Sequence, residues 1–284
     1  MPESKSSLLQ WKPVAAPVPT VLRGRYVSLE PLNAQRHAEA LWQAVHGHDE
    51  LWDYLFDGPF ATEADLRMSI EQKEAANDAL FLAIVPVETA ENAPGNSTST
   101  NTRDGFVTGH HFSQAETVAE STRALAPEGS DSRIPRQRRK SSAAGAAGYA
   151  SFMRIEPAHG VVEVGNILLS PALQRTTAAT EAMYLMTRHV FEDLGYRRYE
   201  WKCNAENQPS RRAALRLGFT FEGIFRQHMI IKDMNRDTAW FSMLDHEWPA
   251  RKRAFESWLN PANFDDEGKQ RQTLSEIAAA QRAS

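Results

Sequence analysis

The stretch VVEVGNILLSPALQRTTAATEA, residues 161–182, decides the fold. Its first nine residues, 161–169, are apolar on both faces, which is typical of a strand in the middle of a sheet. Small residues and threonines follow, and from about residue 176 to residue 194 apolar side chains recur at helical spacing. The segment therefore predicts a central strand, a tight turn and a long helix that crosses back over the sheet as a right-handed connection.

Strand and helix signals alternate on both sides of this segment. Apolar, β-branched runs predict strands, and helical spacing with Thr or Asn at the start predicts helices. The expected strands cover residues 21–30, 81–85, 148–155, 198–203, 219–231 and 238–247, and the expected helices cover residues 34–45, 62–76, 207–217 and 248–259. This order indicates an α/β chain in which a mixed sheet is flanked by helices.

We expect one folded domain over residues 21–259, with an N-terminal tail (1–20) and a polar, mobile C-terminal tail (260–284). Within the domain, residues of about 87–147 are rich in Ser, Thr, Asn, Ala, Gly and Pro and end in the basic cluster RIPRQRRKSSAAGAAG. Such a composition buries too little apolar surface to offset chain entropy, so it predicts a disordered insertion in place of a hairpin loop. The basic cluster is most simply a solvated linker, and it leaves nuclear import open.

The bulk composition excludes several classes of protein. A net charge of −4 gives no general attraction to nucleic acid or to an anionic membrane surface. No apolar run reaches the roughly 18 residues that span a bilayer, and the first residues hold no apolar signal segment. The one cysteine, Cys203, excludes an intrachain disulfide and a cysteine-based metal cluster, and we expect no metal. A cytoplasmic protein is the expectation, with a nuclear location and a homo-oligomer left open.

The turn before the long helix has the features of a phosphate-binding site. Small side chains at a helix start expose successive backbone N–H groups, and the helix dipole adds partial positive charge there. We expect a pyrophosphate group to lie against this turn. The residues concerned are Gln174, Arg175, Thr176, Thr177, Ala178, Ala179 and Thr180. An ordinary Thr-capped helix start explains the same residues equally well.

Four segments in the same order resemble a known superfamily. Gln174–Ala179 (QRTTAA) resembles the acyl-CoA-binding motif of the GNAT acetyltransferases, Q/R-x-x-G-x-G/A, and the following TEA looks like the RimJ/RimL branch. Segments similar to that branch are also found at residues 25–32 (RYVSLEPL), at residues 163–165 (EVG) and at residues 207–219, where NQPS (207–210) and LRLGF (215–219) together form one match. The resemblance covers about residues 22–247 without the insertion, and four ordered matches are far more specific than any one of them.

The resemblance implies a GNAT-like fold with a mostly antiparallel sheet and an acetyl-CoA-dependent N-acetyltransferase. The acceptor would be a primary amine, either a protein N-terminus or a small molecule, that attacks the thioester directly. In this fold the central strand separates from its neighbour and pairs with the pantetheine arm, which points to Ile167, Leu168 and Leu169. Backbone N–H groups of Ile167 and Leu168 would polarise the thioester carbonyl.

Four polar residues are the candidates for the remaining chemistry. An attacking alkylamine has a pKa of about 10 and must first lose a proton, for which Glu163 on the central strand is the first candidate and His228 the second. By the resemblance, Ser210 would donate to the thiolate leaving group and Asn207 to the pantetheine arm. A salt bridge or a surface position for Glu163, and helix capping for Ser210 and Asn207, remain open. Glu181 is expected to be structural.

One departure from the motif favours a second hypothesis. Thr177 stands where the motif usually has glycine, and a Cβ there obstructs a phosphate if the position requires a positive φ. With the long insertion, this motivates an alternative function, a catalytically weak or inactive acyl-CoA-binding module that acts through protein contacts. A different acyl group, such as succinyl, would require a pocket lined with arginine. The acceptor amine is not indicated by the sequence.

Overall fold

The computed structural model describes residues 11–87 and 145–283, and its strands form one sheet. The order across the sheet is β1-β2-β3-β4-β5-β6-β8-β7. The strands are β1 (Leu22–Arg23), β2 (Val27–Pro31), β3 (Ala79–Pro86), β4 (Gly148–Glu156), β5 (Val161–Leu169), β6 (Arg198–Asn204), β7 (Thr220–Ile231) and β8 (Met234–Leu244). Neighbouring strands run antiparallel except β5 and β6, which are parallel. The predicted mixed, mostly antiparallel sheet is confirmed.

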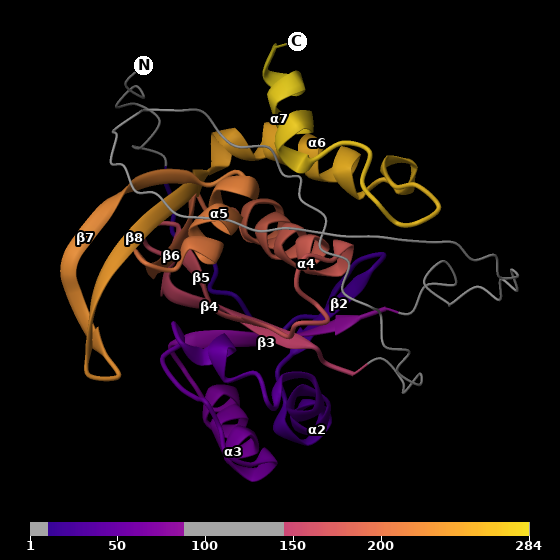
Figure 1. Cartoon of the computed structure of the whole chain (residues 1–284). Coiled ribbons are helices and arrows are strands. Elements are labelled where there is room, and N and C mark those ends of the chain that lie inside the picture. Colours follow the sequence, from indigo (N-terminus) through magenta and orange to yellow (C-terminus); the bar gives the residue numbers. More distant parts are fainter. Residues whose placement is uncertain (1–10, 88–144, 284) are drawn as a thin grey trace, which may run out of the picture.

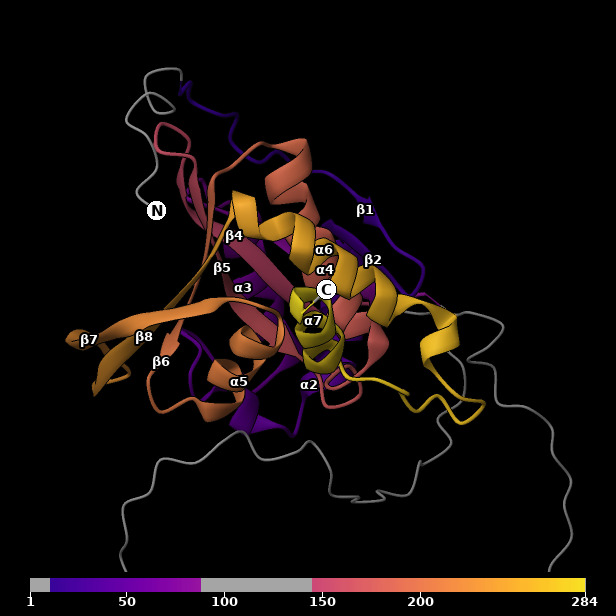
Figure 2. The ribbon, with the colours of Figure 1, turned by 90° about the horizontal axis from the view of Figure 1, so that it is seen from above.

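Helices cover both faces of the sheet (Figure 1). They are α2 (Ala34–Val45), α3 (Glu63–Glu74), α4 (Thr177–Arg188), α5 (Gln208–Arg216), α6 (Trp248–Leu259) and α7 (Leu274–Ala283). Helices α2 and α3 lie on one face, and α4, α5, α6 and α7 lie on the other, where α6 and α7 are stacked over α4 (Figure 2). The bounds expected for the strand 161–169 and for the helices 34–45 and 248–259 agree with those of β5, α2 and α6.

The alternation of side chains along β3 shows that this part of the sheet is buried on both sides. Leu82 and Ile84 pack into the core beneath α4, whereas Phe81 and Ala83 pack into the core beneath α2 and α3. Successive strand residues point to opposite faces, so a strand that is apolar at every position needs cover on both. This explains the continuous apolar run from which the strand was predicted.

Helix α4 is the crossover between the parallel strands β5 and β6, and one buried carboxylate fixes it to the start of the sheet. Glu181 is 6% exposed and accepts backbone N–H bonds from Arg25 (2.9 Å), Tyr26 (2.6 Å) and Val27 (3.0 Å). A Cβ built on Gly24 would lie 2.4 Å from this carboxylate. The structural role expected for Glu181 is confirmed, and its three bonds hold the turn between β1 and β2.

Two predicted strands differ from those observed. The expected first strand is interrupted, because the N–H groups of residues 25–27 bond to Glu181 and the chain turns there between β1 and β2. The last hairpin is tighter than expected: β8 begins at Met234, and the turn consists of Lys232 and Asp233, both with positive φ (51° and 61°). Neither the long-range bonds nor this turn follows from a local pattern.

The C-terminal residues are folded, which corrects the expectation of a polar, mobile tail after residue 259. Helix α7 packs on α6, and its Leu274 (3% exposed) and Ile277 (7% exposed) are part of the core. The Asn263 side chain joins the intervening segment by donating to the carbonyl oxygens of Trp258 and Gln272. Two apolar residues three positions apart form a sufficient buried stripe although the surrounding composition is polar.

The predicted insertion lies almost wholly outside the described residues, which stop at Val87 and resume at residue 145. The strands on either side of it pair with each other, with Ile84 opposite Gly148. The described part of the expected N-terminal tail contacts the turn between β4 and β5, where Trp11 donates to the Ala158 carbonyl at 2.9 Å. None of the helices in residues 11–87 and 145–283 combines the length and hydropathy that crossing a bilayer requires.

Replacing Glu181 by Gln should lower the free energy of unfolding by about 2–3 kcal/mol, because at least one buried N–H group loses a charged acceptor. Urea denaturation measures this directly. Glu39→Gln, at an exposed position of α2, is the control and should change the stability by less than about 0.5 kcal/mol. Equal stabilities of the two variants would contradict the anchoring role of Glu181.

Candidate functional site

The strands β5 and β6 separate in the middle of the sheet. They pair only over Val161–Val164, opposite Arg198–Trp201, whereas β6 continues along β8 as far as Asn204. Beyond Val164, the described residues provide β5 with a partner only on its β4 side. A positive φ at Asn166 (49°) marks the bend of β5. The segment 165–169 therefore has an open edge that faces β6.

Backbone alternation decides which residues serve this open edge. The N–H of Ser170 donates to Ala147, on the side of β4, and the carbonyl of Leu169 accepts from the Gln174 side chain on the other side. Since successive residues of a strand direct their backbone groups to opposite sides, Ile167 and Leu169 face the open edge and Leu168 faces β4. Of the two N–H groups expected to polarise a carbonyl, that of Ile167 therefore faces the open edge, and that of Leu168 faces β4.

The start of α4 lies directly after this edge. Thr176 is the N-cap, and its hydroxyl accepts the N–H of Ala179 (3.1 Å) and donates to the Leu173 carbonyl (2.7 Å). Helix geometry leaves the N–H groups of Thr177 and Ala178 without intrahelical acceptors. These groups, together with the helix dipole, are the ones predicted to bind an anion. The Thr-capped helix start is thus observed, and the anion site stays a prediction.

The absence of the motif glycine has little consequence for the backbone. Thr177 is the first residue of α4 and does not have a positive φ, whereas Arg175 does (61°). Glycine relieves the strain that a residue with a Cβ has at positive φ, and a residue with ordinary helical dihedral angles has no such strain. The Thr180 hydroxyl, in contrast, is engaged within the protein: it donates to the Thr176 carbonyl and accepts from Arg216 of α5.

The start of α5 brings Ser210 close to the sulfur of Cys203. Asn207 caps α5 by accepting the N–H of Ser210 (2.9 Å), which confirms the capping alternative for Asn207. Ser210 is the third residue of the helix and not its cap. Its hydroxyl accepts from the Trp201 indole (3.0 Å). Burial raises the pKa of the Cys203 thiol, and the nearby Ser210 hydroxyl opposes this shift. The Ser210 hydroxyl therefore lies near a sulfur atom.

Glu163 is buried within a layer of charges on the face of the sheet opposite α4. It is 4% exposed, and its carboxylate lies 3.0 Å from Arg154 Nε and 2.9 Å from Lys202 Nζ. Lys202 also pairs with Glu200 at 2.6 Å. Burial raises the pKa of Glu163, and the positive charges of Lys202 and Arg154 act against this increase. The salt-bridge alternative for Glu163 is thus observed, and the raised pKa keeps it suited to accepting a proton.

His228 belongs to the same electrostatic environment. Its Nδ1 lies 2.9 Å from the Thr238 hydroxyl, and burial, followed by the charges of Arg154, Arg236 and Lys202, lowers the pKa of the imidazole. The ring is therefore neutral at pH 7.

Sequence reasoning missed the cations of this layer, namely Arg154, Lys202 and Arg236. A signal was available in β6 and β8, where Glu200 and Lys202 alternate with apolar residues and pair with Ser242 and Trp240 of the neighbouring strand. Period-two alternation places such residues on one face. The pattern predicts a polar face of the sheet, but it does not predict which positive and negative side chains form ion pairs on that face.

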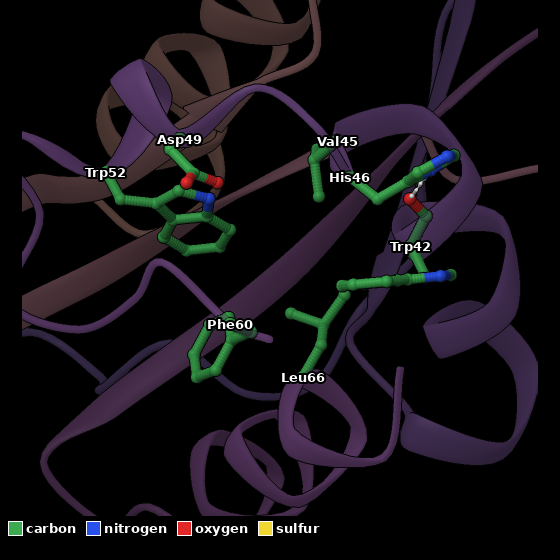
Figure 3. Close-up of a pocket in the computed structure, with 7 residues that line it drawn as sticks. All are labelled: Trp42, Val45, His46, Asp49, Trp52, Phe60 and Leu66. Carbon is green, nitrogen blue, oxygen red and sulfur yellow. Dashed lines mark hydrogen bonds between the residues drawn. The ribbon is translucent and has the colours of Figure 1, made fainter. Parts of the chain in front are cut away.

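A cavity between α2 and α3 does not compete with this site. It is lined by Trp42, Val45, His46, Asp49, Trp52, Phe60 and Leu66 (Figure 3). Its volume of about 10 Å³ is at the lower limit for one water molecule. Among the described residues, no group of three or more His, Cys, Asp or Glu side chains is placed to hold a metal ion.

Comparison with known proteins agrees with this geometry. A family model described as an acetyltransferase (GNAT) domain matches residues 99–220. The crystal structure of a GCN5-related N-acetyltransferase from Brucella melitensis is 39% identical, with a TM-score of 0.75, over 96% of this chain and 100% of that one. The chain therefore belongs to the GCN5-related N-acetyltransferase (GNAT) superfamily, whose co-substrate is acetyl-CoA.

Within the superfamily the chain is RimJ/RimL-like, as the sequence segments indicate. The ribosomal-protein-serine acetyltransferase of Escherichia coli K12 is 32% identical over 90 residues, or 32% of this chain, and the match spans about half (50%) of that curated relative. A putative ribosomal-protein-serine acetyltransferase from Vibrio cholerae shares the fold at 15% identity, with a TM-score of 0.52 over 80% of this chain and 99% of that one.

Replacing Ala178 by Glu should weaken acetyl-CoA binding by at least about tenfold, because a carboxylate would stand where a pyrophosphate is expected, while acidic residues suit a helix start and preserve the fold. Thr177→Gly is the matched control in the same turn. Since Thr177 has helical geometry, this variant should remain within about threefold of the wild type, well below 1 kcal/mol. Calorimetric titration measures both, and a large gain in affinity for Thr177→Gly would contradict the helical interpretation.

Proposed function

We propose that the protein transfers an acetyl group from acetyl-CoA to a primary amine, which attacks the thioester directly. One observation carries this proposal: the open edge of β5 ends at the N-terminus of α4, so unpaired strand groups and an anion-binding helix start are adjacent. A long amide-containing arm that ends in a pyrophosphate matches both parts. Membership of the GNAT superfamily supports acetyl transfer in general.

The chain offers a separate binding position for each part of the co-substrate. The backbone groups of Ile167 and the N–H of Leu169 are available to pair with the pantetheine amides, and the N–H groups of Thr177 and Ala178 point toward the expected pyrophosphate. Arg175 adds a positive charge at the same turn. Acetyl-CoA supplies an activated acyl group as a thioester, and holding it beside the acceptor converts a two-body encounter into a positioned reaction.

Three groups of the chain then act on charge and protons. The N–H of Ile167 donates toward the open edge and stabilises negative charge on a carbonyl oxygen placed there. Glu163, with its pKa raised by burial, receives the proton that the amine must lose, directly or through water. The Ser210 hydroxyl, which lies near the sulfur of Cys203, donates to the departing thiolate.

The alternative of an inactive acyl-CoA-binding module has less support. Its main motivation was Thr177, whose helical geometry leaves the helix N-terminus accessible in principle to phosphate. The relatives with printed functions are acetyltransferases. The name of the E. coli relative suggests a protein substrate for that enzyme. For this chain, the proposed acceptor is a primary amine.

Replacing Glu163 by Gln should lower kcat by about 10²–10⁴-fold with little change in acetyl-CoA affinity, because the amine loses its proton acceptor. In the wild type, kcat/KM should rise with pH through a pKa above that of an exposed glutamate, since only the ionised carboxylate accepts the proton. The variant should lack this acidic limb. Initial rates of free-thiol release across pH measure both effects.

Glu200→Gln provides the control for the charge layer, because Glu200 pairs with the same Lys202 but has no proposed catalytic contact. Its kcat should stay within about tenfold of the wild type. Equal losses in the two variants, with the acidic limb intact in Glu163→Gln, would assign Glu163 a purely structural role.

Replacing Ser210 by Ala should lower kcat by about 10–100-fold, the effect of one hydrogen bond to a charged group, and leave KM for the acceptor unchanged. Single-turnover measurements separate this effect from product release. An unchanged kcat would mean that the thiolate departs without help from Ser210.

A further inference from the structure

Arg236 of β8 is a buried cation that forms no ion pair with any residue that the structure describes. The residue is 7% exposed, and in residues 11–87 and 145–283 its Nε has no hydrogen-bond partner and its guanidinium has no ion pair within 4.0 Å. Its observed contact is with an aromatic ring: the guanidinium carbon lies 5.1 Å from the centre of Phe56. A buried charge without a partner is strongly unfavourable, so arginine is rarely buried unless it is paired.

The neighbouring carboxylates are already used by other cations. Glu163 interacts electrostatically with Arg236, but its ion pairs are with Arg154 and Lys202. Glu200 pairs with Lys202 and Arg198. Burial lowers the pKa of Arg236, as expected for a cation that is not neutralised locally. The charge layer thus retains capacity for one more anion at Arg236.

Arg236 is held in place by contacts between distant segments. The β7–β8 hairpin extends from the sheet toward the side of α2 and α3 (Figure 1). At its turn, Lys232 Nζ donates to the carbonyl oxygens of Trp52 and Asp57, both at 2.9 Å. Phe56 of the same loop packs on Arg236. The guanidinium is therefore fixed in orientation before any ligand arrives, which reduces the entropy lost on binding.

Arg236 is also close to the groups of the proposed reaction. It interacts electrostatically with Glu163, the proposed proton acceptor. His228 lies in the field of the same arginine. A substrate whose anionic group binds at Arg236 would consequently have that group close to its own reacting atoms.

We propose that Arg236 binds a carboxylate group that one of the two substrates carries close to the reacting amine or acyl carbon. The planar guanidinium matches a carboxylate through two parallel N–H bonds, and the free Nε is one of the required donors. The carboxylate belongs either to the acceptor, as in an α-amino acid, or to the acyl group, as in succinyl. This inference rests on the proposed acyl transfer for the identity of the substrates.

Calorimetry with matched ligands tests the acceptor as the source. N-acetylalanine and N-acetylalaninamide differ in the carboxylate, and each is titrated into the full chain saturated with CoA. The wild type should bind the acid about tenfold more tightly, Arg236→Gln should abolish this preference, and Arg236→Lys should keep part of it. Arg226→Gln, at an exposed position of β7, should retain the full preference.

A second arm tests the acyl group as the source. Succinyl-CoA and acetyl-CoA are titrated into the wild type and Arg236→Gln, and a preference for succinyl-CoA that disappears in the variant assigns the carboxylate to the acyl group. The proposal is overturned if the wild type shows no carboxylate preference in either arm, or if a preference survives in Arg236→Gln. If the protein binds no CoA, the first titration is repeated without CoA. A carboxylate preference that depends on Arg236 would then support this inference even though the proposed acyl transfer had failed.

The stability of Arg236→Gln provides an independent readout. Removing an unpaired buried charge should leave the melting temperature equal to or above that of the wild type, because binding residues are often retained at a cost to stability. A decrease of several degrees, with no change in ligand preference, would show instead that Arg236 serves the fold.

Discussion

The end of pairing between β5 and β6 after Val164 is the constraint on which the rest of the structure depends. Parallel neighbours need a crossover connection, here α4, and that helix must begin where β5 ends. The strand edge that is left open therefore lies beside the positive end of a helix dipole. Unpaired backbone groups inside a sheet require a partner, and a ligand with amide groups can provide one. The strand separation and the anion site thus follow from a single feature of the topology.

The position of α4 depends in turn on buried charge. Glu181 fixes the helix to the turn before β2, and the chain breaks its first strand to supply the three N–H groups. On the opposite face, Glu163, Lys202 and Glu200 form a layer of close ion pairs across β5 and β6. Buried ion pairs contribute little net stability because desolvation is costly. In this protein the ion pairs fix the orientation of the three side chains, because each side chain is held by a partner on a neighbouring strand.

The sequence predicted those features that depend on local repetition. Strand β5 and helices α2 and α6 have strong periodicity and clear ends, and their bounds agree with the structure. Helix α7 was missed because two buried apolar residues carry its packing in a polar segment. The motif located the helix start but not the side of the strand to which each backbone group points, which depends on strand register. Arg236 was invisible for the same reason, because only the folded sheet shows which carboxylates its neighbours have taken.

The charge balance of the site also bears on the acceptor. Arg154, Lys202 and Arg236 act electrostatically on Glu163, and the carboxylates of Glu163 and Glu200 face these three cations. Burial, followed by the charges of the same cations, lowers the pKa of His228, and the same two causes lower the pKa of an incoming ammonium group and promote the loss of its proton. The same field repels an acceptor whose only charge is positive. An acceptor with its own carboxylate avoids this conflict, because the anion is attracted to Arg236 while the amine is placed where it is most easily deprotonated.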